Sequence, residues 1–341
     1  MNYNFAIVGF QHSHITMFIE AMIKAGHHCI GIYDRNPLVL AAAYAEQHHI
    51  PLIHDVNEIW NSSATIIGSS AINDEKVAII EACCEHGKHI MLDKPIVTNR
   101  DGLNRLETVI NRGRIQIGLM LTSRDKRSIY TLKQMIDAGE LGTILSLTMR
   151  KPHKLNPSSR PDWHFSKQRN GGIIMDLFIH DFDILRWLTG QETDTISSVL
   201  AKSILPQYSD FYDVAAVQTI MNGGIVAQLY ADWHTPEKLW SYGDLRIFVT
   251  GTLGSAELRL TGDPSVGQEE FLFTVMHSRP FAKIPLLDVP ITYMEDFLHR
   301  IENKPHEVTH LDLLLASKAA IEADENAVIV RNTGMKTKVS P

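Results

Sequence analysis

Short apolar runs alternate with stretches of helical periodicity over residues 1–121. This alternation is typical of β-α-β units, whose strands build a parallel sheet. We expect six strands, at Phe5–Val8, Cys29–Tyr33, Pro51–His54, Thr65–Gly68, His89–Leu92 and Ile115–Leu121. The pattern therefore predicts an α/β chain whose first domain, residues 1–121, is a doubly wound sheet of the Rossmann type.

Residues that start and stop helices separate the expected strands. Ser13 is the expected N-cap of the first helix, and Asp74 precedes a helical stretch at Glu75–His86. Gly26 and Gly87 follow two expected helix ends, where glycine accepts a left-handed conformation. These signals support the β-α-β interpretation.

From residue 122 onward, strands dominate the pattern. A helix at Arg124–Ala138 and a strand ending at Arg150 come first, and helical patterns return at Tyr293–Glu302 and Leu311–Asn326. Between them we expect strands at Thr195–Val199, Val214–Met221, Ile225–Trp233, Leu245–Gly251 and Ala256–Leu260. The pattern predicts a second, α+β domain over residues 122–341, with a large mixed, mainly antiparallel sheet that is open on one face.

The turn after the first strand lies where a dinucleotide-binding fold places its phosphate loop. Only the first glycine of G-x-G-x-x-G is present, because Gln11 and His14 occupy the other two glycine positions. We expect the whole turn to contact the cofactor: Gly9, Phe10, Gln11, His12, Ser13 and His14.

Asp34 ends the second strand, 20 residues after His14. A carboxylate at this spacing bonds the ribose hydroxyls and repels a 2′-phosphate, which favours NAD over NADP. Arg35 can stack on adenine or pair with a phosphate, so NADP remains possible. We include both residues in the expected cofactor site.

Asp176 and His180 lie one helical turn apart, so both project from one helix face, which Asp183 continues. A carboxylate can orient an imidazole, whose ordinary pKa of about 6.5 suits proton transfer. An isolated pair of this spacing is usually a polar surface stripe. The nucleotide-fold signals, and Asp93-Lys94-Pro95 after the fifth strand, favour a catalytic pair.

Composition and net charge narrow the classes of molecule that the chain is expected to bind. The chain has 341 residues, a net charge of −7 and a pI near 6.2, so nothing indicates binding to nucleic acid or to anionic membranes. Three cysteines do not suggest a disulfide framework, and no apolar stretch reaches the length of a bilayer span. The residues before Phe5 include no basic region or cleavage site, so we expect no signal peptide. We expect a cytoplasmic protein that binds a small molecule and other copies of itself.

Several segments together resemble the glucose-fructose oxidoreductase / inositol dehydrogenase (Gfo/Idh/MocA) family along essentially the whole chain. They are Gly87-Lys-His-Ile-Met-Leu-Asp-Lys-Pro95, Gly171-Gly-x-x-x-Asp-x-x-x-His-x-x-Asp183 and Leu185-Arg-Trp-Leu-Thr-Gly190. The resemblance implies that Lys94, Asp176 and His180 are catalytic. It also implies that Ser69, Asn73, Asp93 and Lys94 contact the cofactor.

The resemblance implies an NAD(P)-dependent dehydrogenase that transfers hydride between the nicotinamide and a secondary alcohol of a sugar, inositol or related polyol. Lys94 would stabilise the substrate oxygen, His180 would handle its proton, and Asp176 would orient the imidazole. Trp163 and His164 join these three as expected substrate contacts, since an indole can cover a sugar ring. More remote candidates are Lys151, His153, Arg160 and His234.

Three other interpretations stay open. A metal site could combine the His12-Ser-His14 turn with Asp176, His180 and Asp183, but no spacing is diagnostic, so we expect none. The altered glycine loop would suit an NAD-binding sensor without turnover. Transient oxidation could also drive a net hydrolysis, elimination or epimerisation. We further expect a homodimer or homotetramer formed through the C-terminal sheet.

Overall fold

The computed structural model describes residues 2–36 and 39–331. They form two compact units that we describe separately. The first unit contains Met1–Thr122, Gln168–Gly171 and Pro290–Lys318. The second unit contains Ser123–Lys167, Gly172–Val289 and Ala319–Pro341.

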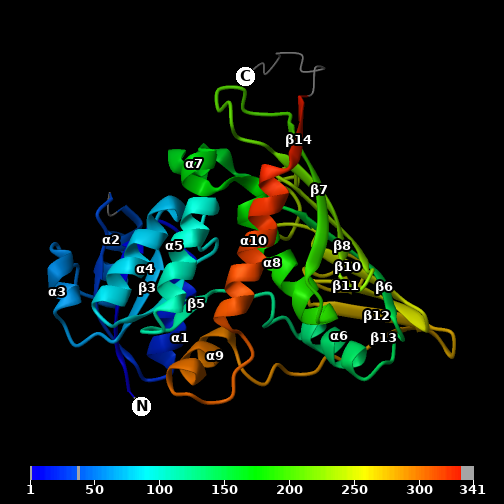
Figure 1. The fold of residues 1–341 in the computed structure, drawn as a ribbon, viewed down its shortest axis with the longest axis horizontal. Helices are drawn as coiled ribbons and strands as arrows, with labels where there is room; N and C mark the ends of the chain where they lie inside the picture. The colour runs from blue at the N-terminus through cyan, green and yellow to red at the C-terminus, as the bar shows by residue number, and fades with distance from the viewer. Residues whose placement is uncertain (1, 37–38, 332–341) are drawn as a thin grey trace. The chain divides into compact units, whose positions relative to one another are not determined.

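A five-stranded parallel sheet forms the centre of the first unit (Figure 1). Its strand order is β2-β1-β3-β4-β5, the doubly wound arrangement that the sequence predicts. The bounds are β1 Asn4–Phe10, β2 His28–Tyr33, β3 Ile66–Ser70, β4 His89–Leu92 and β5 Ile117–Leu119. All five residues of β3 are buried, because helices cover both faces of such a sheet.

The expected strand at Pro51–His54 is wrong. Only Leu52 pairs with the sheet, through an isolated parallel bridge to Ile32 at its edge. Ile32 donates to the Pro51 carbonyl, and Ile53 donates to the Ile32 carbonyl. Pro51 has no N–H to extend this ladder, so the run remains a single bridge.

Helices follow the strands of the first unit in turn. They are α1 Ile15–Lys24, α2 Val39–His48, α3 Val56–Trp60, η1 Asn73–Glu75, α4 Lys76–Glu85, α5 Arg100–Asn111 and α9 Tyr293–Ile301. The expected N-cap at Ser13 is wrong, because α1 is capped by His14, which is already in helical geometry and gives no side-chain cap bond. Asp74 lies inside the 3-10 turn η1 rather than before it.

Two later segments belong to the first unit, although we expected every residue after 121 in the second domain. The clearest cause is Phe297 of α9, which is fully buried in the same core as Phe5, Ile7 and Met91. A Cβ on Gly118 would lie 2.8 Å from Cδ2 of Phe297, so the glycine makes room for this ring. Long-range packing, which has no local sequence signature, therefore returns the chain to the first unit.

The second unit is built on a nine-stranded mixed sheet of order β13-β12-β11-β10-β6-β9-β8-β7-β14. The β6–β9 and β7–β14 pairs are parallel, and the other pairs are antiparallel. The bounds are β6 Ile144–Pro152, β7 Thr193–Lys202, β8 Val214–Met221, β9 Val226–Asp232, β10 Arg246–Gly251, β11 Gly254–Arg259, β12 Phe271–Met276, β13 Arg279–Lys283 and β14 Ala327–Arg331. We had not expected β12, β13 or β14.

Helices α6 and α8 pack against this sheet (Figure 1). The remaining bounds are α6 Arg127–Asp137, η2 Pro157–Ser159, η3 Asp162–Phe165, α7 Lys167–Asn170, α8 Gly172–Thr189 and α10 His310–Glu325. Along the strands, buried residues alternate with exposed apolar ones such as Leu145, Val226, Phe248 and Val275. One face of the sheet is therefore packed, and the other presents apolar side chains to solvent.

A helix needs about 20 mainly apolar residues to span a bilayer. None of the helices in residues 2–36 and 39–331 is both long enough and apolar enough to cross a membrane.

Candidate active site

The carboxyl ends of the parallel strands collect the cofactor residues expected in the first unit. The turn from Gln11 to His14 follows β1, Asp34 follows β2, Ser69 lies at the end of β3, and Asp93 follows β4. Parallel strands end at one edge of a sheet, which is where open α/β sheets bind ligands. The fold thus brings these residues to a common edge.

Gly9 is required because the end of β1 closely approaches the segment after β3. It has a φ of +88°, and a Cβ there would lie 2.4 Å from Cβ of Ala71. Both the dihedral and the contact exclude a side chain. The single glycine that remains of the dinucleotide motif therefore has a structural reason.

Asp34 is 8% exposed and holds the altered phosphate loop. Its Oδ2 accepts bonds from the backbone N of Phe10 at 2.5 Å and from Nε2 of Gln11 at 2.8 Å. Its Oδ1 accepts from the N of Asn36 at 2.8 Å. Gln11, which replaces a glycine, is thus tied to the carboxylate expected to bond the ribose.

A cavity of about 190 Å³ opens beside Asp34. Its wall is mainly apolar, with the polar groups of Asp34, Arg35 and Glu75 among the lining. An apolar slot bordered by a carboxylate and a guanidinium fits the adenosine half of a dinucleotide. The other lining residues are Val8, Gly9, Tyr33, Val56, Trp60, Ala71, Ala78, Ile79 and Ala82.

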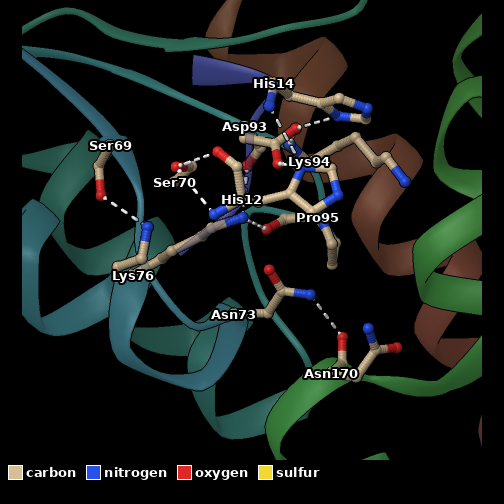
Figure 2. A network of polar contacts seen from close by, with 11 residues as sticks. His12, His14, Ser69, Ser70, Asn73, Lys76, Asp93, Lys94, Pro95 and Asn170 are labelled. Atoms are coloured by element: carbon tan, nitrogen blue, oxygen red, sulfur yellow. Dashed lines mark hydrogen bonds and ion pairs between the residues drawn. The ribbon is translucent and has the colours of Figure 1, made fainter. Parts of the chain in front are cut away.

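His12 and His14 both turn toward the Asp93 carboxylate (Figure 2). Nδ1 of His12 lies 3.2 Å from Oδ2, and Nδ1 of His14 lies 3.1 Å from Oδ1. Burial alone raises the pKa of Asp93, but its bonds to the two histidines and the Lys76 charge outweigh burial and hold that pKa well below its ordinary value. Burial lowers the pKa of His12, against the opposing effect of Asp93.

The same three side chains are potential metal ligands, since their donor atoms lie within 4.8 Å of one another. Two imidazoles and a carboxylate suit zinc or iron. Lys76 lies close enough to influence Asp93, and Lys94 lowers the pKa of His12. These two ammonium groups repel a divalent cation, which supports our expectation that no metal binds here. That expectation stays a prediction.

Lys94 follows Asp93 and is half-buried. Its backbone N donates to Oδ1 of Asp93 at 2.8 Å, and its bond to Pro95 is cis. Asp93 therefore connects the histidines of the phosphate loop to the backbone of Lys94.

Lys76 is a residue that our sequence reasoning missed. It is fully buried, and its Nζ donates to the carbonyl of Asp93 at 2.7 Å and to that of Pro95 at 3.1 Å (Figure 2). These carbonyls flank Lys94, so one ammonium group anchors the backbone on both of its sides. A lysine that directly precedes the apolar run Val77–Ile80 was the available signal.

Ser69, Ser70 and Asn73, at the end of β3 and just after it, bond three different segments of the first unit. Ser70 Oγ donates to the carbonyl of His12 at 2.8 Å, and Asn73 Nδ2 donates to the carbonyl of Asn170 at 2.8 Å (Figure 2). Ser69 is fully buried, and its carbonyl accepts from the Asp93 N at 2.9 Å. Among the described residues, these three therefore bond backbone groups of the site and hold them in position.

Asp176 and His180 lie on α8 in the second unit. Asp176 is 6% exposed, and His180 is partly exposed. Two buried ion pairs fix the helix just beyond them. Lys151 Nζ lies 2.8 Å from Oδ1 of Asp181, and Arg124 bonds both oxygens of Asp183 at 2.8 and 2.6 Å. Lys151 and Arg124 thus hold α8 in place through Asp181 and Asp183.

We expect Asp183→Asn to lower the free energy of unfolding of the second unit by about 3–5 kcal/mol, because it leaves the Arg124 guanidinium buried without its charge partner. Urea unfolding followed by circular dichroism measures the loss. Asp137→Asn removes the exposed Lys133 pair and should change stability by less than about 0.5 kcal/mol. Equal losses in both variants would contradict the structural importance of the buried pair.

Trp163 and His164 lie in η3, 9% and 5% exposed. The His164 ring packs 5.5 Å from Trp233 and 5.6 Å from Phe165, measured between centroids. The remaining candidates are engaged as well: Arg160 lies over Trp233, His153 packs edge-on to Tyr242, and His234 pairs with Asp213. Substrate binding by Trp163 and His164 stays a prediction.

Family models match both parts of the chain. Residues 3–116 match an oxidoreductase family with an NAD-binding Rossmann fold, and residues 129–257 match the GFO/IDH/MocA C-terminal domain. The two matches fall on the parallel sheet and on the mixed sheet respectively.

Curated relatives have modest identity. The chain is 27% identical over 254 residues to inositol 2-dehydrogenase 2 of Saccharopolyspora erythraea, covering 72% of this chain and 69% of that one. It is 33% identical over 187 residues to scyllo-inositol 2-dehydrogenase (NAD(+)) of Bacillus subtilis, covering 52% and 49%. The matched regions thus span from about half to about two thirds of such relatives.

A solved structure extends the likeness to the whole fold. Levoglucosan dehydrogenase in complex with NADH and levoglucosan superposes with a TM-score of 0.79 at 19% identity, covering 96% of this chain and 97% of that one. Its identity is low, so it supports the architecture of both units rather than a substrate. With the two family matches it leads to one conclusion: the chain belongs to the Gfo/Idh/MocA family of oxidoreductases and carries that family's NAD-binding Rossmann domain.

Proposed function

We propose that this chain is an NAD-dependent dehydrogenase that acts on a secondary alcohol of a sugar, inositol or related polyol. The observation that carries the proposal is the placement of Asp34 and Lys94 at one edge of the parallel sheet, with the phosphate loop between their strands. Relatives named as inositol dehydrogenases support the substrate class.

Bound NAD supplies a hydride acceptor; the other functions fall to the chain. Gly9 and the turn to His14 would hold the pyrophosphate, and Asp34 would bond the ribose. The Lys94 ammonium would stabilise negative charge on the substrate oxygen, and the His180 imidazole would accept the hydroxyl proton. Asp176 would orient the imidazole or bond a neighbouring hydroxyl.

Ligand screening tests the proposal. Because a ligand that binds the folded state raises the unfolding temperature, we expect NAD to shift it more than NADP does. A panel of inositols, sugars and other polyols, followed by NADH absorbance, should then identify a substrate. Absence of a shift with either cofactor would contradict the assignment of the site.

The same assay separates the alternatives. A dehydrogenase forms one NADH for each product, whereas transient oxidation forms product without accumulating NADH. A sensor would bind NAD and turn over none of the panel. His12 and His14 both bond Asp93. These bonds would favour the sensor only if they prevented the phosphate loop from binding NAD in a position for turnover.

Lys76→Met should lower turnover by about tenfold, because the carbonyls that flank Lys94 lose their shared donor and the Lys94 ammonium loses its exact position. The measurement is kcat on the identified substrate, with KM determined separately.

Lys88→Met is the matched control, because that buried lysine also donates to two backbone carbonyls, of Ser62 and Ala64. If both variants lose stability equally and neither loses turnover, Lys76 has only a structural function.

We also propose that the exposed apolar face of the mixed sheet forms a dimer or tetramer interface. Leu145, Val226, Phe248 and Val275 on this face would be buried by a second copy. Sedimentation equilibrium measures the assembly, and a monomer at micromolar concentration would contradict the proposal.

A further inference from the structure

Glu75 bonds three donors on two separate segments of the first unit, Arg35-Asn36 and Arg169. Its carboxylate pairs with NH2 of Arg35 at 2.8 Å, with Nδ2 of Asn36 at 3.1 Å and with NH2 of Arg169 at 2.8 Å. Its side chain is only 9% exposed. Sequence reasoning treated this position as part of a helix and gave it no function.

The pairing with Arg35 uses both sides of the guanidinium fork. Nε of Arg35 donates to Oε2 of Glu75 at 3.1 Å, and NH2 pairs with Oε1. The bond to Glu75 raises the pKa of Arg35, as expected for a charge-assisted pair. A guanidinium bound in this way has its bidentate face directed to a carboxylate rather than to a ligand.

Asp34, Arg35 and Glu75 all line the same cavity. Two carboxylates therefore accompany the single guanidinium there. A 2′-phosphate on the adenosine ribose is recognised by an arginine near the end of the second strand, which is the position of Arg35. A 2′-phosphate would have to compete with Glu75 for Arg35 and would also be repelled by the carboxylate of Asp34.

We propose that Glu75 is a specificity-determining residue that makes the chain reject 2′-phosphorylated dinucleotides by occupying the bidentate face of Arg35. This inference deepens the proposed NAD preference and rests on it. Glu75 differs from Asp34 in its partners. Asp34 bonds the phosphate loop itself, so changing it alters binding of every dinucleotide, whereas Glu75 bonds Arg35, Asn36 and Arg169, outside that loop.

Isothermal titration calorimetry of the full chain with NAD⁺ and NADP⁺ tests the proposal without turnover. In Glu75→Gln, which keeps the side-chain shape, the ratio of NADP⁺ to NAD⁺ affinity should rise at least about tenfold. The matched control is Asp74→Asn. Asp74 precedes Glu75 and lies 3.7 Å from Arg169. Its charge raises the pKa of Arg35 less than Glu75 does, and it does not line the cavity, so the ratio should change by less than about threefold.

A double variant tests whether the Arg35 guanidinium, freed from Glu75, is the group that binds NADP⁺. Adding Arg35→Ala to Glu75→Gln should remove the gain in NADP⁺ affinity, because the freed guanidinium is then absent. An unchanged ratio in Glu75→Gln, or a gain that survives the loss of Arg35, would overturn the inference. A chain that binds NAD⁺ and shows these ratios but oxidises no polyol would contradict the proposed dehydrogenase function alone.

Discussion

Lys94→Ala should lower turnover at least about 100-fold while leaving NAD binding nearly unchanged. The ammonium group is the one that we assign to the oxygen on which negative charge develops, so its loss raises the barrier without removing contacts to the adenosine half of the cofactor. Stopped-flow or steady-state NADH absorbance measures kcat, and calorimetry measures the NAD affinity. The backbone N of Lys94, not its side chain, bonds Asp93, so alanine keeps that contact.

Lys24→Ala is a suitable control, because Lys24 is an exposed residue in the last turn of α1 in the same unit. It should retain turnover within about twofold. Near-normal turnover of Lys94→Ala on the identified substrate would remove Lys94 from the mechanism. Loss of NAD binding as large as the loss of kcat would instead assign it to cofactor binding.

His180→Ala should also lower turnover at least about 100-fold, since hydride can leave carbon only as the hydroxyl proton is transferred to a base. The helix around it should persist, because the buried pairs Lys151–Asp181 and Arg124–Asp183 hold α8 independently of this side chain. A folded variant with an unchanged unfolding midpoint and low kcat is therefore the expected result.

His277→Ala controls for loss of an imidazole, because His277 is exposed and belongs to the same unit. Asp176→Asn, by contrast, should reduce turnover less than His180→Ala if Asp176 only orients the ring. Full activity of His180→Ala, or an equal loss in the His277 variant, would contradict proton transfer by His180.

The two side chains that replace glycines in the phosphate loop are the main departure from the family pattern. Gln11 and His14 occupy glycine positions, and the structure accommodates them by side-chain bonds: Gln11 to Asp34, and His14 to Asp93. Both carboxylates are also expected cofactor contacts. The loop of this chain is thus fixed by its own side chains.

The local sequence pattern determined much of the fold and the position of several candidate site residues. Apolar runs separated by helix signals predict the parallel sheet, and strand ends predict that Asp34 and the Asp93-Lys94 pair lie at its ligand-binding edge, because parallel strands all end on one side. Helical spacing places Asp176 and His180 on one face of α8. The family resemblance then supplied their expected chemistry.

Only the tertiary structure decided which partners the charged residues have. Asp183 continues the face of His180 in sequence, yet Arg124 binds it, 59 positions away. Lys76, Glu75 and the return of Phe297 to the first core likewise depend on contacts between distant segments. Periodicity indicates which way a side chain points within its own helix or strand. Its burial and its partners depend on how distant elements pack together, and a local pattern does not describe that packing.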